Sequence, residues 1–344
     1  MQKYHILLLF ILIVILAGCG KIDQSDATVK NLNMSLHATT AGMEYFYSKD
    51  QGGFELATGI PYSELACKDC HIADGDCNAC HSVDESGKRL SPADDACLKC
   101  HSRQKKEMSK FSDVHMEKNM TCGHCHDAMD MHGDSTRFVS MLEPGGIIAD
   151  CNNCHNADQV HGRLEEWEMH LNKFDCAVCH TQVSTGCINC HFETEIATKG
   201  KVKKAYNAFP DWKVLLKRDD KITTGTIMTL VYENKAQVVL APYYSHTVIK
   251  PDYMTICDQC HDNKLLKEYQ KTGKMKLVTW DDKDKKLDFA SGTIFIPEDW
   301  RTSLEIDFVT LDSVGAKQWK KIKPDTVMYQ ILFSAPLSDE ETSF

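Results

Sequence analysis

One short pattern dominates the sequence: Cys-x-x-Cys-His, in which two Cys are separated by two residues and a His follows at once. It occurs seven times between residues 67 and 191 and once more at residues 257–261. The eight copies use 16 of the 17 Cys and leave only Cys19 over. No Cys remains for a disulfide framework, so the Cys content indicates a repeated attachment site instead.

This pattern is typical of covalent c-type haem attachment. The two thiols bond to the haem vinyl groups, and the His that follows becomes the proximal iron ligand. Zinc sites and thioredoxin-like sites also use Cys-x-x-Cys pairs, but neither needs a His directly after the second Cys. The predicted haem-bearing Cys are Cys67, Cys70, Cys77, Cys80, Cys97, Cys100, Cys122, Cys125, Cys151, Cys154, Cys176, Cys179, Cys187, Cys190, Cys257 and Cys260. The predicted proximal ligands are His71, His81, His101, His126, His155, His180, His191 and His261.

With eight such motifs the chain resembles the multihaem c-type cytochromes, specifically the octahaem ones. The resemblance implies eight c-type haems as cofactors. Seven motifs within 125 residues leave about 18 residues for each haem, which is too few to enclose it in a side-chain core. We therefore expect a mostly irregular and α-helical fold with little regular secondary structure, in which the stacked haems form the core.

The first 18 residues are similar to an export signal. One Lys precedes an apolar run over residues 6–17, which is shorter than the roughly 20 residues of a membrane-spanning helix. Residues 16–19, Leu-Ala-Gly-Cys, resemble a bacterial lipobox, in which cleavage leaves a lipidated Cys at the new N-terminus. An ordinary signal with an incidental Cys is the alternative. We predict a lipoprotein signal over 1–18, lipidation at Cys19 and a polar tether over 19–36.

The remaining chain divides into a predicted heptahaem domain over 37–200 and a β-rich region over 201–344 that carries the eighth haem. The second region has β-branched and apolar runs separated by turn residues. There we predict a β-hairpin from 226–232 and 236–240, a helix over 264–270, and strands over 276–280, 287–289 and 304–308.

Two apolar periodicities in the heptahaem region predict helices that present further His. Met108, Phe111 and His115 share one helical face. A second stripe, Leu164, Trp167, Leu171 and Phe174, accompanies His161 and His170. The last two His are nine residues apart, which places them on opposite sides of one helix, so they would serve two different haems.

The number of His limits how the irons are coordinated. The chain has 16 His, of which His5 lies in the predicted signal and eight are proximal. The remaining candidates for eight distal positions are His37, His115, His132, His161, His170, His246 and His124. His124 lies inside the fourth motif, so it is either a ligand of a neighbouring haem or a surface residue. Identical subunits bring the same shortfall, so at least one haem must take another ligand, such as Met, Lys or water.

The formal net charge of −10 argues against nucleic-acid binding, which needs a basic surface, and fits docking to basic patches of redox partner proteins. The haem density predicts an electron-transfer protein rather than an enzyme, lipid-anchored at the periplasmic face of a membrane or at the outer membrane or cell surface. It would pass electrons between periplasmic carriers and an outer-membrane or extracellular acceptor, as a single chain, a homo-oligomer or a filament.

The shortfall in His favours an alternative function. In haem count the chain is similar to hydroxylamine oxidoreductase and octahaem tetrathionate reductase. That similarity implies a reductase of small nitrogen or sulfur oxyanions, acting on nitrite, hydroxylamine or tetrathionate at the haem without a distal His. No catalytic residue is identified by the sequence.

Overall fold

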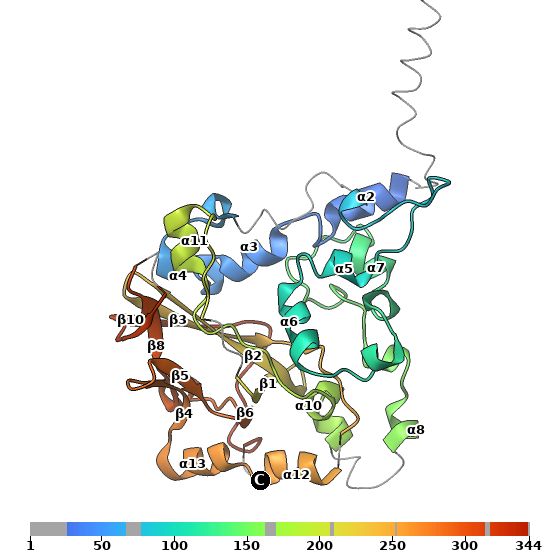
Figure 1. Cartoon of the computed structure of the whole chain (residues 1–344). Coiled ribbons are helices and arrows are strands. Elements are labelled where there is room, and N and C mark those ends of the chain that lie inside the picture. Colours follow the sequence, from blue (N-terminus) through green and yellow to red (C-terminus); the bar gives the residue numbers. More distant parts are fainter. Residues whose placement is uncertain are drawn as a thin grey trace, which may run out of the picture.

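The computed structural model describes residues 26–66, 77–161, 170–206, 210–251, 253–313 and 317–342. Cys19, the predicted signal and the first motif with Cys67, Cys70 and His71 lie outside these ranges. Two halves stand side by side in Figure 1. The strands form one half, and short helices and loops that carry most of the motifs form the other.

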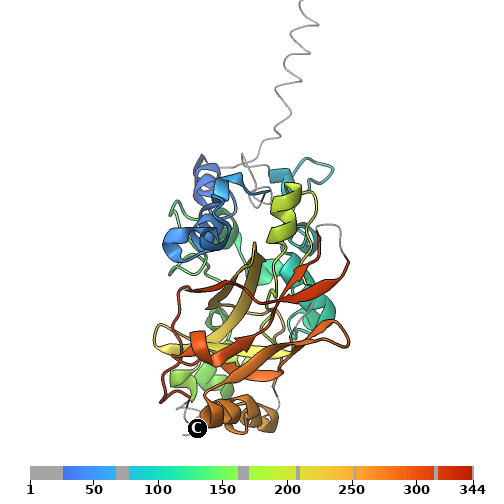
Figure 2. The same ribbon diagram turned by 90° about the vertical axis from the view of Figure 1, so that its left-hand side faces the viewer.

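The chain enters through short helices that border both halves. They are α2 (Asp26–Met34), α3 (Ala41–Tyr47), η1 (Lys49–Gln51), α4 (Glu55–Thr58) and η2 (Tyr62–Glu64). Part of the predicted tether is therefore helical, and α2 contacts α7 in the motif-bearing half. Tyr47, Phe54 and Leu65 are buried against Leu230 and Val239 of the sheet. In Figure 2 these blue N-terminal helices lie at one end of the strands.

The motif-bearing half is built from helical turns of nine residues or fewer. They are η5 (Cys77–Ala79), α5 (Asp94–Cys97), α6 (Ser102–Lys110), η6 (Met116–Lys118), η7 (Cys122–His124), α7 (Ala128–His132), η8 (Cys151–Asn153), α8 (Ala157–His161) and α10 (Cys176–His180). Helix α11 (Phe192–Thr198) lies instead on the side of the strands, near α4 in Figure 1, and contacts β2 (Lys221–Tyr232). Isolated helices this short are marginal in water, so they depend on what they pack against.

The other half contains three sheets. A five-stranded sheet has the order β10-β3-β2-β1-β6, beside a three-stranded sheet β5-β4-β7 and a pair β8-β9. The strands are β1 (Trp212–Arg218), β2 (Lys221–Tyr232), β3 (Lys235–Pro242), β4 (Met275–Asp281), β5 (Lys286–Phe289), β6 (Gly292–Phe295), β7 (Leu304–Ile306), β8 (Phe308–Leu311), β9 (Trp319–Ile322) and β10 (Thr326–Ile331). The helices are α12 (Tyr253–His261), α13 (Lys264–Thr272) and α14 (Trp300–Ser303).

The predicted hairpin is confirmed as the centre of the large sheet. Strands β2 and β3 pair antiparallel from Gly225 with Pro242 to Tyr232 with Lys235. The two-residue loop has Glu233 at φ 45° and Asn234 at φ 64°. Two positive φ angles are the signature of a type I′ turn, which matches the twist of paired strands.

Local signals also place three other predicted elements correctly. The helix predicted over 264–270 is α13, which begins after Asn263, whose side chain accepts a hydrogen bond from the Leu266 N–H at 2.8 Å. The helix ends at Gly273 in the left-handed conformation. The strands predicted over 276–280 and 287–289 are β4 and β5, which pair antiparallel.

The strands enclose a conventional side-chain core. Trp212, Ile227, Leu240, Met275 and Trp300 each expose 1% of their surface or less. They belong to one apolar cluster that joins the five-stranded sheet to the smaller sheets. Burial of large apolar side chains at this density stabilises the β half independently of any cofactor.

Two predictions about single elements are wrong. The helix that was to place Met108 and His115 on one face ends at Lys110, and Phe111 is extended with φ −123° and ψ 150°. The Asp113 carboxylate then accepts the His115 N–H at 2.9 Å and starts a separate turn. The strand predicted over 304–308 is split between β7, which pairs with β4, and β8, which pairs with β9.

Of the second apolar stripe, Leu164 and Trp167 lie outside the described residues, whereas Leu171 and Phe174 are described. His161 ends α8, and His170 is described after the gap. No helix within the described part of the chain is long and apolar enough to span a membrane.

Candidate haem-binding centre

Four of the motifs share one backbone turn. In each, the N–H of the second Cys and the N–H of the His both donate to the carbonyl of the first Cys. The His N–H distances are 2.8 Å for His81, 3.0 Å for His101, 3.0 Å for His126 and 2.9 Å for His155. This turn brings two thiols and an imidazole together at one point of the chain, as attachment of one planar group requires.

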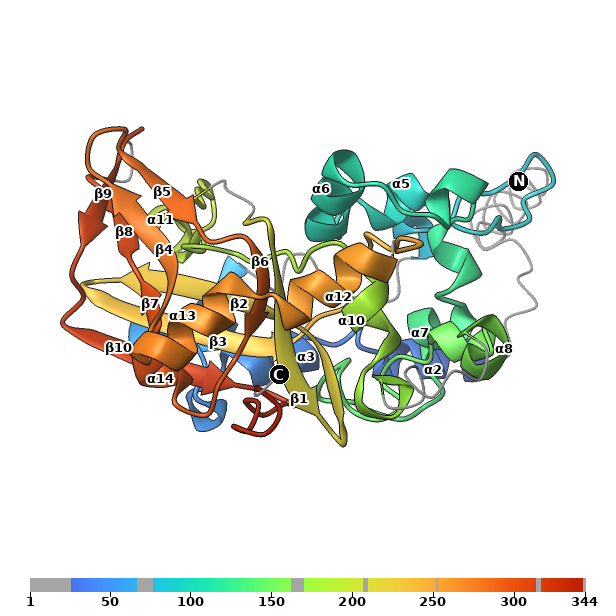
Figure 3. The same ribbon diagram turned by 90° about the horizontal axis from the view of Figure 1, so that it is seen from below.

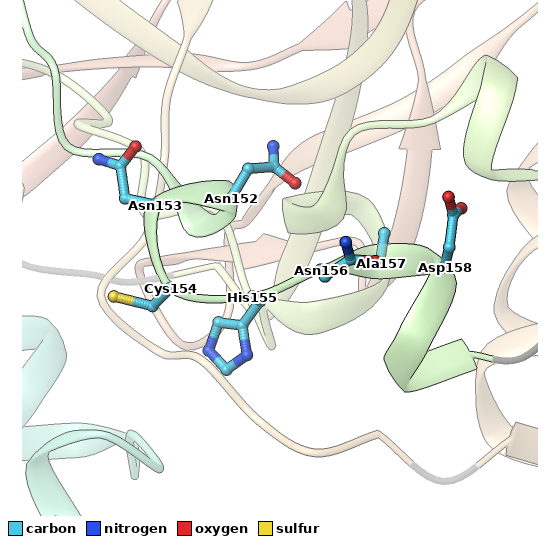
Figure 4. Close-up of a pocket in the computed structure, with 7 residues that line it drawn as sticks. All are labelled: Asn152, Asn153, Cys154, His155, Asn156, Ala157 and Asp158. Atoms are coloured by element: carbon cyan, nitrogen blue, oxygen red, sulfur yellow. The ribbon is translucent and has the colours of Figure 1, made fainter.

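Figure 4 shows this arrangement in the fifth motif. The His155 ring extends away from the ribbon beside the Cys154 thiol. Both line a hollow of about 410 Å³, together with residues 152, 153 and 156–158. The turn is fixed from outside by Asp150, whose carboxylate accepts the Asn152 N–H at 2.8 Å.

The central finding is that six motif His each lie opposite one of the predicted distal His. The partners come from distant parts of the chain, and their ring centroids are 5.9 to 6.2 Å apart. The pairs, with the motif His first, are His81 with His132 (6.0 Å), His101 with His37 (6.2 Å), His126 with His246 (6.2 Å), His155 with His115 (6.1 Å), His180 with His161 (5.9 Å) and His261 with His170 (6.2 Å).

These separations fit one iron between each pair of rings. If one nitrogen of each imidazole bonds the same metal ion at about 2 Å, the ring centroids stand about 6 Å apart. Among the residues that the structure describes, no three or more His, Cys, Asp or Glu side chains are grouped around a metal position. The imidazoles occur instead in opposed pairs, and two imidazoles are the axial ligand set of a six-coordinate bis-His haem.

Several of these rings are held through Nδ1, which leaves Nε2 for a metal. Nδ1 of His81 lies 2.8 Å from the Leu90 carbonyl oxygen, and Nδ1 of His161 lies 2.9 Å from that of Ala157. Nδ1 of His126 lies 2.9 Å from the Asp130 carboxylate. A partner at the second nitrogen fixes ring orientation and tautomer in metal sites generally.

Burial favours the neutral form of these imidazoles, which is the form that binds metal. Removal from water lowers the pKa of His101, and the neighbouring His126 lowers it further. Burial likewise lowers the pKa of His132 and of His180. The pKa of His246 is lowered by burial as well, although the nearby Glu107 carboxylate acts in the opposite direction.

Close thiols place consecutive motifs side by side. Burial, the Asp94 carboxylate and the Cys97 thiol of the third motif raise the pKa of Cys122 in the fourth to about 12. A hydrogen bond from Cys151 lowers the pKa of Cys176 to about 7, which joins the fifth motif to the sixth. Burial raises the pKa of Cys125 in the fourth motif, and the nearby Cys154 thiol of the fifth motif acts in the same direction.

The eighth motif joins this series next to the sixth, although His180 and His261 are 81 residues apart in the sequence. Burial and the Cys179 thiol of the sixth motif together raise the pKa of Cys260 to about 11. Helix α12, which carries the eighth motif, lies beside α10 in Figures 1 and 3. The order in space is therefore third, fourth, fifth, sixth and eighth.

The second motif connects to this series as a side branch. Its His81 faces His132 at the end of α7, the helix that directly follows the fourth motif. In the same helix Asp130 contacts His126 of the fourth motif. The second and fourth motifs thus share α7 as a support.

A buried lysine lies between the sixth and eighth motifs. Lys213 of β1 is 5% exposed and donates from Nζ to the Val178 carbonyl at 2.8 Å. Burial lowers its pKa, and the Cys179 and Cys260 thiols oppose that shift. Sequence reasoning missed this residue, although a Lys inside the apolar run of β1 is the signal that could have found it.

A second charged cluster missed by sequence reasoning centres on Glu107, which is 1% exposed. Its carboxylate accepts the Tyr243 hydroxyl at 2.8 Å and the His246 N–H at 3.0 Å. The Arg103 guanidinium lies 3.4 Å from the centroid of the Tyr243 ring. The cluster supports the backbone of His246, the partner of His126.

The seventh motif differs from the others. Its Cys187 carbonyl accepts the Thr229 N–H at 2.9 Å, and its Cys190 N–H donates to the Thr229 carbonyl at 2.9 Å. Strand β2 thus holds this motif, and Asn189 within it has a left-handed φ of 51°. Among the described residues, no imidazole is in ring contact with His191.

His124, the remaining distal candidate, is exposed and supports its own motif turn. Its Nδ1 accepts the Thr121 N–H at 2.9 Å. The structure brings it to no other motif His within the described residues.

No protein-family model, no curated protein and no solved structure matches this chain.

Proposed function

We propose that this chain is an octahaem c-type cytochrome that conducts electrons through closely spaced haems. The observation that carries the proposal is the set of six opposed imidazole pairs, each made of one motif His and one His from elsewhere. Two opposed imidazoles suit an iron that exchanges electrons without exchanging ligands. Tetrahedral zinc, by contrast, takes four protein ligands in structural sites.

The contacts between motifs support conduction along a defined route. Thiols of the third and fourth, fourth and fifth, fifth and sixth, and sixth and eighth motifs interact in turn. Groups attached at these thiols would stand next to one another. The contribution of the polypeptide is then to fix their order and spacing.

We further propose that the protein works outside the cytoplasm, anchored through lipid at Cys19, and exchanges electrons with redox partner proteins or an extracellular acceptor. The lipobox-like sequence before Cys19 and the need to attach c-type haem after export support this location. The net charge of −10 favours partners that present basic patches.

Injection of an electron at one end of the route tests the proposal. A ruthenium photosensitiser attached through Asp262→Cys, beside the eighth motif, supplies the electron. The haem of the third motif is marked by His37→Met, because a Met ligand raises its potential and changes its spectrum. We expect light to reduce the marked haem on a time scale that transient absorption resolves.

Deletion of single motifs provides the controls. Cys151→Ala with Cys154→Ala removes the fifth haem from the middle of the route and should slow reduction of the marked haem at least tenfold. Cys77→Ala with Cys80→Ala removes the second haem, a side branch, and should leave that rate within twofold. Equal effects of the two deletions would contradict the proposed route.

A further inference from the structure

The seventh motif carries an inference that rests on the proposed function but goes beyond electron conduction. We propose that the iron held by His191 has no second imidazole and that its sixth position accepts a small exogenous ligand with a lone pair. Such a ligand is of the size of nitrite, hydroxylamine or carbon monoxide. Among the motifs that the structure describes, the inference assigns a missing imidazole to one particular haem; the first motif, with His71, lies outside the described residues.

The first argument is that the other described His are already engaged. Twelve of them form the six opposed pairs. His124 is exposed and holds its own turn through Thr121. Within the described ranges, His191 therefore stands apart from every other imidazole.

The second argument is the backbone of the motif. The motifs at residues 77, 97, 122 and 151 close the same turn on the carbonyl of their first Cys. The seventh is instead clamped to Thr229 of β2, and its middle residues Ile188 and Asn189 are 2% and 3% exposed. Asn189 also receives support from β8, because its side-chain N–H donates to the Val309 carbonyl at 2.7 Å. Strand β2 thus fixes this attachment point, whereas the motifs at residues 77, 97, 122 and 151 depend on short turns.

The third argument is how the His191 ring is oriented. It stacks on Phe192 with 6.0 Å between centroids and 6° between planes, and Phe192 stacks on Tyr47 at 5.6 Å and 10°. Nδ1 of His191 lies 2.7 Å from a carboxylate oxygen of Glu195, which is 2% exposed, although the angle falls short of a hydrogen bond. These contacts direct Nε2 away from α11, toward the side where an iron would be bound.

The Glu195 carboxylate gives the site its chemical character. A carboxylate at the second nitrogen of a ligating imidazole raises the basicity of that ligand. A haem held by His191 would therefore have a more electron-rich iron, and the vibrational bands of a bound carbon monoxide would report this change. Glu195 is therefore a positioning and tuning residue that acts through His191.

The chain offers a matched control at another motif. Asp130 lies 2.9 Å from Nδ1 of His126, also at i and i+4, but His126 faces His246 at 6.2 Å. Both carboxylates support a motif His, and only the His191 iron is proposed to have an open position. Glu195→Gln and Asp130→Asn therefore separate ligand binding from proximal support.

The test uses the full-length haem-loaded protein reduced under carbon monoxide and observed by resonance Raman spectroscopy. We expect carbon monoxide to bind the haem of the seventh motif and to give a carbonyl-stretching band that responds to substitution of Glu195. Glu195→Gln should shift that band and the iron–His stretch of the unliganded protein. Asp130→Asn should leave both unchanged.

Three results would overturn the assignment. Carbon monoxide binding to none of the covalently attached haems would show a sixth protein ligand on every iron. One of the Met residues that pack against the same apolar cluster as Cys190 would be an example. Binding that Glu195→Gln leaves unaltered would place the open iron in another motif. An equal shift of the carbonyl-stretching band by Asp130→Asn would show that the band does not report on the haem held by His191. A protein without covalent haem would contradict the proposed function itself, so the two failures are distinguishable.

Discussion

At the scale of single residues, the imidazole pairs are the feature on which the account depends. In each pair a motif His, fixed close to two thiols, meets a His whose ring reaches it from a distant part of the chain. The second nitrogen of several rings contacts a carbonyl or carboxylate, and burial holds the pKa of several others below the usual range. Both effects favour neutral imidazoles with Nε2 available to a metal.

Removal of one partner should change the spin state of one haem. His132→Ala deletes the ring 6.0 Å from that of His81, so the second-motif iron should lose its sixth ligand. We expect the high-spin signal in the low-temperature EPR spectrum of the oxidised protein to rise by about one haem per chain. His124→Ala is the control, because His124 is exposed and faces no motif His in the described residues. An unchanged spectrum for His132→Ala would contradict the pairing.

The buried Lys213 should raise the potential of the neighbouring haems. A positive charge near an iron stabilises the reduced form, and a unit charge at about 10 Å with an effective dielectric constant near 20 changes a one-electron potential by on the order of 50 mV. Lys213→Met should therefore lower the potential of one or two haems by tens of millivolts at pH 6, measured by spectroelectrochemical titration. Lys217→Met, on the same strand with its side chain 37% exposed, should have little effect. Equal shifts for both variants would exclude a specific role for Lys213.

At the scale of elements, sequence patterns predicted correctly those helices and strands whose formation depends on residues close together in the sequence. The hairpin of β2 and β3 follows from β-branched runs around a two-residue turn, and α13 follows from its Asn263 and Gly273 caps. The helix expected to reach His115 ends at Lys110 instead, and the Asp113 side chain takes the backbone N–H of His115. A run of alternating residues also could not reveal that β7 and β8 pair with different strands.

The candidate site shows the same limit. The motif residues and the set of distal candidates could be taken from the sequence, because spacing and counting suffice for both. The pairing of each distal His with its motif could not be predicted from the sequence. His37 meets His101, and His246 meets His126, across long stretches of chain. Glu107 and Lys213 were missed because their roles depend on tertiary burial.

The hairpin should depend on the absence of a side chain at Gly225. A Cβ at this position would lie 2.4 Å from Cδ1 of Leu216 on the neighbouring strand. Gly225→Ala should therefore lower the free energy of unfolding of the β half by about 1–3 kcal/mol. Thermal unfolding monitored by far-ultraviolet circular dichroism measures this change.

Gly42→Ala is the matched control for that substitution. Gly42 lies in α3, and a Cβ there would make an ordinary contact of 3.5 Å with Leu36. Alanine also has the higher helix propensity, so this variant should be neutral or stabilising by up to about 1 kcal/mol. Equal destabilisation by both variants would show that the packing at Gly225 is not the cause.

At the scale of the whole molecule, a β half with its own core holds a half in which short turns carry most of the motifs. The sixth, seventh and eighth motifs lie where the two halves meet, through α10 against β2, the clamp on Thr229 and α12 beside β6. The sheets thus fix one end of the motif series, and the third motif lies toward the other end near α2 and His37. This arrangement gives a route with two distinct ends.

Anchoring should be separable from electron transfer. Cys19→Ser removes the predicted lipid attachment point without touching any motif, so the exported protein should move from the membrane fraction to the soluble fraction. Its haem content should stay unchanged, because c-type attachment depends only on the motif residues. Fractionation followed by haem staining of a denaturing gel measures both properties. Retention of Cys19→Ser in the membrane would contradict lipidation at this residue.

The measurement that tests the central claim most directly is the intact mass of the purified protein under denaturing conditions. Covalent attachment survives denaturation, so the account predicts a chain that carries eight haems and absorbs as a c-type cytochrome. The bare mass of the chain, or fewer than eight haems in fully matured protein, would contradict it.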